Sequence, residues 1–107
     1  MTITHIVMFR FNTVATKEQI SKVYDDMLRL KTACRREGTD ESYIVSITGG
    51  TSNSKEGKED GMHYAFTVLF ADEKDRSYYL DKDPAHLEFV AGVKPLVDKV
   101  IVFDYNS

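Results

Sequence analysis

A histidine lies on the apolar face of a predicted helix in the last third of the chain. The segment Asp81–Val90, DKDPAHLEFV, has the features of a helix start, with Asp83 as the N-cap and Pro84 at the first helical position. At helical spacing, three apolar residues share the face of His86: Phe89, Val90 and Val93. His86 is therefore either a core histidine that hydrogen-bonds a backbone carbonyl or Asp104, or a general acid or base on the wall of a pocket.

Two further groups could take part in such chemistry. His5 interrupts the more apolar face of an alternating strand, a face that is expected to line a cavity of the folded protein. Tyr78 and Tyr79 lie on a short predicted helix, where a tyrosine hydroxyl could hold a carbonyl or enolate oxygen. Taken singly, each of these residues is also typical of an ordinary amphipathic element.

Metal and cofactor sites are not expected. The chain has three histidines, but no two of them have the i, i+4 spacing of a helical metal site, and none is next to a pair of carboxylates. There is no glycine-rich dinucleotide signature. The stretch GGTSNS has no Lys-Ser/Thr ending and no following helix, which argues against a phosphate-binding loop.

Size and composition predict one small domain that comprises residues 1–107. The chain is 42% apolar, which is sufficient for a core without disulfides, and its single cysteine, Cys34, is expected to be a packing residue. The net charge is −3, with no block of Lys and Arg, so nucleic acid is not an expected partner. Without a long apolar run or a signal-peptide pattern, we expect a cytoplasmic protein that does not enter a membrane.

The periodicity of the apolar residues predicts the order β-α-β-β-α-β. Strands are expected at Thr2–Phe11, Ser42–Thr48, Met62–Phe70 and Lys99–Tyr105, and helices at Thr16–Arg35, near Asp72, and after Asp83. The polar stretch Gly49–Asp60 is expected to be a loop. This order predicts a ferredoxin-like α+β fold, with a four-stranded antiparallel sheet and both helical layers on one face.

Such a sheet leaves its second face open. In the first and third strands both faces carry large apolar side chains, for example Val7 and Phe9 on one face of the first strand and Ile6 and Met8 on the other. An exposed apolar sheet of this size usually marks an interface. The sequence therefore predicts a homodimer in which two sheets pack face to face, burying roughly 1,500 Å² or more.

Four stretches of the sequence resemble one known family, the stress-responsive A/B barrel (Dabb) family. They are THIVMFRF near the start, GMHYAFTVLFAD in the middle, and YYLDKDPAHLEFV and VIVFDY toward the end. The most specific features are the first-strand histidine, the Pro-x-His helix and the closing Asp-Tyr pair. The resemblance extends over nearly the whole chain and implies a dimeric α+β barrel.

Within this family, the chain is similar to polyketide cyclases of the olivetolic acid cyclase type. The resemblance implies that His86 is the catalytic base and that Tyr79 is the tyrosine before it, although the segment between them is one residue longer here. It also matches His5 to the first-strand histidine. His63 stands one position before the usual third-strand histidine, which directs it to the opposite face. Met27 stands where the cyclases have a tyrosine, so both the pocket and the substrate are expected to differ.

Two classes of function follow from these observations. The first is a cofactor-independent cyclase or lyase acting on a polyketide-like or other hydrophobic carbonyl compound. In this enzyme His86 would remove a proton α to the carbonyl, while Tyr79 and His5 orient and polarise oxygen atoms. The second is a non-catalytic dimeric barrel that serves in stress tolerance, ligand carriage or assembly. A cavity of at least about 300 Å³ favours an enzyme or a carrier, whereas a cavity filled by aromatic side chains leaves only a structural role.

Overall fold

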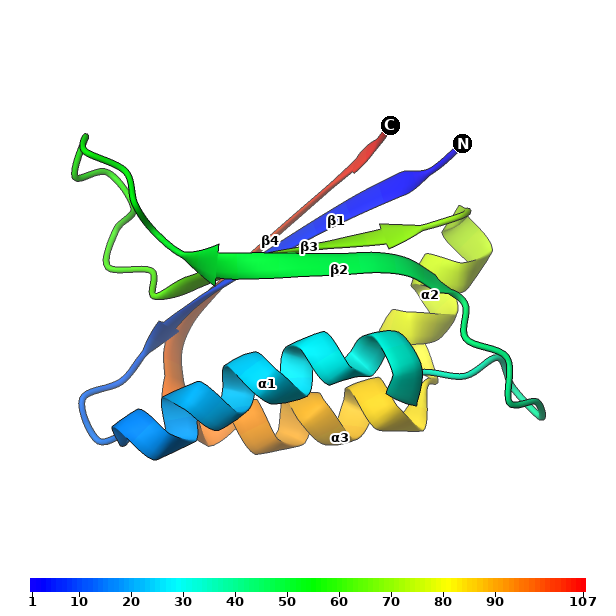
Figure 1. Ribbon diagram of the computed structural model, residues 1–107, viewed down its shortest axis with the longest axis horizontal. Coiled ribbons are helices and arrows are strands. Elements are labelled where there is room, and N and C mark those ends of the chain that lie inside the picture. The colour runs from blue at the N-terminus through cyan, green and yellow to red at the C-terminus, as the bar shows by residue number, and fades with distance from the viewer.

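The computed structural model describes all 107 residues. The elements are β1 (Ile3–Phe11), α1 (Lys17–Ala33), β2 (Ile44–Thr51), β3 (Tyr64–Phe70), α2 (Glu73–Asp81), α3 (Pro84–Val93), a 3-10 turn (Lys94–Leu96) and β4 (Val97–Asn106). The strands form one antiparallel sheet in the order β2-β3-β1-β4 (Figure 1). The predicted ferredoxin-like α+β fold is confirmed.

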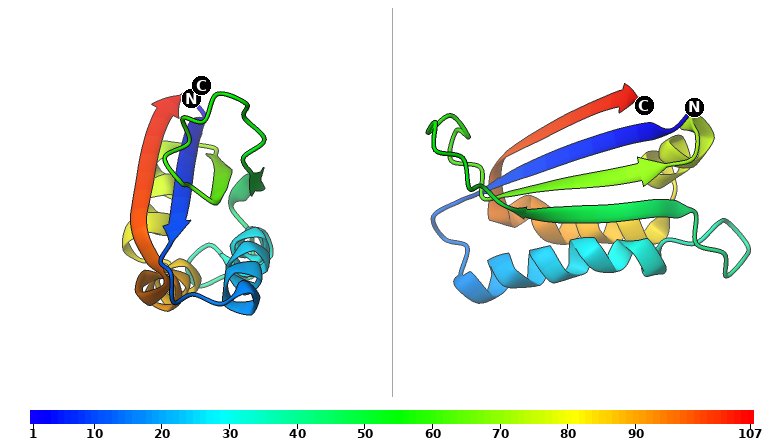
Figure 2. Two further views of the ribbon diagram at one scale, coloured as in Figure 1. Left: turned by 90° about the vertical axis from the view of Figure 1, so that its left-hand side faces the viewer. Right: turned by 45° about the horizontal axis from the view of Figure 1, so that its top comes forward.

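The helices cover only one face of this sheet. Helices α1 and α3 lie side by side beneath it, and α2 lies at the end of the molecule where β3 ends (Figure 1). No helix covers the opposite face, which Figure 2 shows from two further directions. The two chain termini lie close together, and the Ser107 amide donates to the Thr2 carbonyl at 2.8 Å.

Side-chain caps fix the start of each α-helix. At α1, the Thr16 hydroxyl accepts from the Gln19 amide at 3.1 Å, and the Gln19 side chain accepts from the Thr16 amide at 2.9 Å. This is the capping box that the sequence predicts. At α3, one carboxylate oxygen of Asp83 accepts from the Ala85 amide at 2.9 Å, so the predicted N-cap is confirmed.

The hydrophobic core lies between the helices and the covered face of the sheet. The odd-numbered residues of β1 point into it, and so do the buried residues of α1 and β3: Val7, Phe9, Phe11, Val23, Met27, Leu30, Phe66, Val68 and Phe70. Cys34 is 0% exposed within the same core, as a packing residue would be. The face of β1 that carries His5 is therefore the face that packs against the helices.

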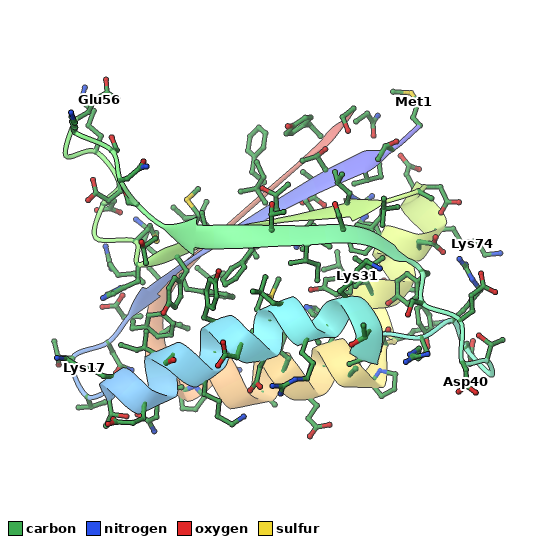
Figure 3. All side chains as sticks on the ribbon, in the orientation of Figure 1. Met1, Lys17, Lys31, Asp40, Glu56 and Lys74 are labelled. Carbon is green, nitrogen blue, oxygen red and sulfur yellow. The ribbon has the colours of Figure 1, made fainter.

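The second strand is longer than the sequence predicts. Gly49, Gly50 and Thr51 were expected to begin a loop, but they continue β2 and pair with β3 as far as Tyr64. The physical reason lies in the packing of Gly49, where an added Cβ would stand 2.2 Å from a ring carbon of Phe66. Only a glycine lets the strand lie this close to the ring. The loop that follows extends away from the body, with Glu56 near its tip (Figure 3).

The uncovered face of the sheet is rich in apolar side chains. They come from β1, β3 and β4: Ile6, Met8, Leu69, Ile101, Phe103 and Tyr105. Phe103 is 62% exposed and Tyr105 is 48% exposed. None of the helices has the length and apolar character needed to span a membrane.

Candidate active site

A small apolar pocket opens between the covered face of the sheet and α3. Its volume is about 240 Å³, and 11 of its 14 lining residues are hydrophobic. The walls come from β1, β4 and α3, and include Val7, Phe9, Phe89 and Val100. This volume is below the roughly 300 Å³ expected for an enzyme or a carrier, so that criterion is not met. The pocket can take only a molecule smaller than a drug-sized ligand.

A larger hollow of about 590 Å³ lies between α1 and α3, away from every histidine. Its lining includes charged residues of α1 that pair with one another, such as Asp26 with Lys22 and Arg29. Neighbouring charges that already form surface ion pairs offer no reactive group. The candidate site is therefore the smaller pocket, which the predicted residues line.

All three residues predicted for the site line this pocket. His5 comes from β1, Tyr79 from α2 and His86 from α3. The rings of Tyr79 and His86 stack with their centroids 3.8 Å apart and their planes at 27°, and the His5 ring lies 6.0 Å from Tyr79 in an edge-on arrangement. The longer segment between Tyr79 and His86 does not remove the tyrosine from the pocket.

The third histidine is not part of the pocket. His63 precedes β3, and its Nδ1 accepts a hydrogen bond from the Phe11 amide at 3.2 Å. Its own amide donates to the Phe9 carbonyl at 2.8 Å. This histidine ties the end of β1 to the start of β3.

An aspartate and an arginine that were not among the predicted site residues complete the surroundings of His5. Asp104 stands directly opposite His5 in the β1–β4 pairing, and its Oδ1 lies 2.6 Å from His5 Nδ1. Its Oδ2 accepts from the guanidinium of Arg76, on α2, at 2.8 Å. The sequence interpretation in which Asp104 partners His86 is therefore wrong. The carboxylate pairs across the sheet with the strand histidine instead.

This pairing determines the tautomer of His5. A carboxylate held by an arginine is ionised and can only accept, so Nδ1 of His5 carries the proton that the bond requires. The neutral ring then has its lone pair on Nε2. Because the His5 side chain is 4% exposed and lines the pocket, that lone pair lies in mostly apolar surroundings.

His86 differs from His5 in having no side-chain hydrogen-bond partner for its ring. Its Nδ1 is buried and makes no hydrogen bond. Burial lowers the pKa of His86, because a charged ring is poorly solvated there, and the nearby Tyr79 carbonyl offsets this effect only in part. His86 is therefore neutral at pH 7, and its ring lines the pocket without an ion-pair partner.

Tyr79 is a neutral hydrogen-bond donor. It is 1% exposed and packs against Phe70, with the ring centroids 5.0 Å apart. Burial raises the pKa of the Tyr79 phenol far above neutrality, and the negative charge of Asp83 adds to this effect. A phenol that keeps its proton can donate to an oxygen atom but cannot act as a base.

A second carboxylate cluster fixes α3 beneath the pocket. The Tyr43 hydroxyl donates to one oxygen of Asp83, and the other oxygen caps α3 through the Ala85 amide.

Burial and the neighbouring Asp83 raise the pKa of the Cys34 thiol to about 12, which makes a nucleophilic thiolate unavailable. No three His, Cys, Asp or Glu side chains lie close enough together to hold a metal ion.

Comparison with known proteins shows where this arrangement belongs. A hydroxynitrile lyase from Passiflora edulis superposes with a TM-score of 0.83 at 23% identity, covering 97% of this chain and 91% of the lyase. An Arabidopsis thaliana protein gives the same score and identity, with 98% and 94% covered. A protein from Thermobifida fusca, described as a dimeric ferredoxin-like protein of unknown function, gives 0.78 at 19% identity, with 100% and 92% covered.

At the level of sequence, no curated protein matches the chain. The family model described as the stress responsive A/B barrel domain, however, matches residues 3–107, which is nearly the entire length. The chain therefore belongs to the stress responsive A/B barrel domain (Dabb) family.

Proposed function

We propose that the protein is a cofactor-independent acid–base enzyme that acts on a small hydrophobic carbonyl compound. The observation that carries this proposal is the pairing of Asp104 with His5, a residue that lines the apolar pocket. An oriented imidazole with a free lone pair is suited to general base catalysis, and the surrounding apolar wall excludes competing water.

The base in this proposal is His5, not His86 as the family resemblance implies. Asp104 holds the His5 ring in one orientation and one tautomer, and it stabilises the imidazolium that forms when Nε2 takes a proton. His86 has no such partner, and burial lowers its pKa, which disfavours the protonated form. The histidine that is oriented for proton transfer is therefore the strand histidine.

Tyr79 and His86 have the complementary role of binding the substrate oxygen. The Tyr79 phenol is protonated, and the neutral His86 ring stacked on it carries one N–H, so the two can hold a carbonyl oxygen while negative charge develops on it. Removal of a proton α to a carbonyl leaves an enolate, which this pair would stabilise.

The pocket volume limits the substrate. Cavities of about 150 Å³ accommodate benzene, so about 240 Å³ holds one substituted ring or a short chain. A polyketide-like substrate would have to extend beyond the mouth of the pocket. Base removal of a hydroxyl proton is also the chemistry of cyanohydrin cleavage, and a hydroxynitrile lyase is among the structural relatives. Both reactions need one base and one oxygen-binding group.

Acetophenone in D₂O gives a direct test, because it has one ring and an acidic methyl group. His5 Nε2 would take a proton from the methyl carbon to leave an enolate, and the ring would then exchange with solvent and return a deuteron. We expect the methyl proton signal in NMR to disappear about 100-fold faster with the protein than with an equal concentration of free imidazole.

The histidine variants assign the role. His5→Gln should abolish this exchange, His86→Gln should slow it less, and His63→Gln is the matched control outside the pocket. Exchange no faster than with imidazole would refute the proposed activity. Exchange that persists in His5→Gln but is lost in His86→Gln would return the base to the helix histidine.

The apolar lining of the pocket also favours a second function, that of a non-catalytic carrier in stress tolerance. Eleven hydrophobic residues would bind a greasy molecule without any chemistry. For a carrier, acetophenone should perturb the NMR signals of Val7 and Phe89 without deuterium exchange, and His5→Gln should still bind it. Exchange that depends on His5 would exclude a purely carrying role.

We also propose that the protein is a homodimer, formed by the uncovered sheet faces of two copies. The support is the exposure of Phe103 and Tyr105 on that face, together with relatives that are described as dimeric.

Light scattering tests the homodimer and should give twice the mass of the 12.2 kDa chain. Phe103→Glu should yield monomers, whereas the control Val14→Glu, at a 79% exposed loop residue, should remain dimeric. A monomeric parent protein would refute this assembly.

A further inference from the structure

The carboxylate of Asp104 is shared between two basic side chains. One oxygen bonds His5 at 2.6 Å and the other bonds Arg76 at 2.8 Å. The side chains of His5, Asp104 and Arg76 are 4%, 21% and 23% exposed. These three residues, from β1, β4 and α2, form the His5–Asp104–Arg76 chain of contacts.

An aspartate by itself would have two opposing effects on a catalytic histidine. It orients the imidazole, but a nearby negative charge also favours the protonated ring, and more strongly when the ring is buried. A ring that already carries a second proton at neutral pH cannot take one from a substrate. A base needs the orientation that a carboxylate gives without being held permanently in the charged form.

We infer that Arg76 is a positioning residue that balances the charge of Asp104 and so keeps His5 neutral at physiological pH. The guanidinium fixes the carboxylate through its second oxygen, which leaves the first oxygen for His5 Nδ1. The consequence for catalysis rests on the proposed function, whereas the effect on the protonation of His5 does not.

The other groups that face His5 are uncharged, so only Arg76 can offset the charge of Asp104. From α2, Tyr79 presents a protonated phenol, and from α3 the neighbouring ring of His86 is neutral. From β3, Phe70 contributes an apolar ring 6.1 Å away. The charges of Asp104 and Arg76 cancel, so the cluster as a whole is neutral only when His5 is neutral.

Titration of His5 by NMR in the full chain tests this inference without any substrate. In Arg76→Gln the carboxylate loses its cation, so we expect the midpoint of the His5 titration to move up by about one pH unit. Arg76→Lys should bring the midpoint most of the way back to the parent value, because lysine keeps the positive charge. The return should be incomplete, because lysine lacks the fork geometry of the guanidinium. Arg29→Gln, which breaks an exposed ion pair with Asp26 on α1, is the matched control and should change nothing at His5.

The outcomes separate a tuning role from a structural one. A His5 midpoint that stays unchanged or moves down in Arg76→Gln would overturn the inference, even if the variant were less stable. If the parent protein catalyses acetophenone exchange, Arg76→Gln should lose about 3-fold at pH 7 and recover at higher pH, where the ring is again neutral. An equal loss at every pH would also contradict it. A parent without exchange activity would refute the proposed function but leave the NMR test intact.

Discussion

Two aspartates in this molecule have similar bonding but different surroundings and different roles. Asp83 is 1% exposed, and its two oxygens bond the Tyr43 hydroxyl and the amide that starts α3. Asp104 is a fifth exposed on its side chain, and its two oxygens bond His5 and Arg76. Both carboxylates link elements that are far apart in the sequence.

The difference lies in whether the partners can change protonation near pH 7. Burial raises the pKa of the Tyr43 phenol far above that range, so the Asp83 cluster is fixed and anchors the helix that carries His86. The partner of Asp104 is an imidazole that lines the pocket, and imidazole is the side chain best suited to proton transfer at physiological pH. A carboxylate between inert groups is a structural support, whereas one beside an imidazole can serve proton transfer.

Removal of the structural carboxylate should have the largest effect on stability. Asp83→Ala deletes a helix cap and leaves the buried Tyr43 hydroxyl without an acceptor, so we expect a loss of about 3 kcal/mol in the free energy of unfolding. Urea denaturation followed by circular dichroism measures it. Tyr43→Phe, which removes the donor but keeps the cap, should cost about 1 kcal/mol. A loss below 1 kcal/mol for Asp83→Ala would remove the distinction between the two clusters.

Removal of the Asp104 carboxylate should have a large effect on exchange activity and a small effect on stability. An amide in Asp104→Asn can donate to His5 Nδ1 and favour the wrong tautomer, so we expect about 100-fold slower acetophenone exchange. The unfolding free energy should fall by less than about 1 kcal/mol, because the site is partly exposed. A variant with unchanged exchange but a large loss of stability would make Asp104 a structural residue like Asp83.

Protonation of His86 should produce a smaller, pH-dependent effect. Burial lowers the pKa of His86 in the folded state, so the unfolded chain binds the proton more readily. The stability that depends on a neutral ring is complete above about pH 6.5 and is lost as the pH falls below that value. His86→Phe keeps the stack on Tyr79 and should flatten the decline in unfolding free energy between pH 7 and pH 5. Parallel curves for the parent and the variant would contradict this explanation.

Cys34 should show the smallest response. Its thiol pKa of about 12 and its complete burial predict no reaction with a disulfide reagent at pH 8 in the folded protein. One thiol per chain should react after denaturation with urea. Rapid reaction in the native state would show that the Asp83 cluster opens readily and is not a fixed support.

The fold could be predicted because its elements have clear periodicity and caps. The alternation of β1, the capping box at Thr16 and the Asp83-Pro84 helix start are local signals, and each lies where the sequence predicts. The extension of β2 was missed because Gly49-Gly50 is typical of a loop in isolation. Its strand conformation depends on the ring of Phe66, a contact made across the sheet.

The site could be predicted only in part, for the same reason. His5, Tyr79 and His86 could be proposed from residue type, periodicity and family resemblance, and they do line one pocket. The partner of Asp104 depends on the register between the first and last strands, which sets His5 opposite it. Arg76 gave no signal, because an arginine on a short polar helix is usually a solvated residue.

The most direct test of the central claim is the protonation state of His5 at pH 7, measured by long-range ¹H–¹⁵N NMR with and without acetophenone. The account predicts a neutral ring with the proton on Nδ1, and an Nε2 signal that shifts when acetophenone binds. A ring protonated on Nε2, a doubly protonated ring, or an Nε2 signal unmoved while other pocket residues respond would contradict it.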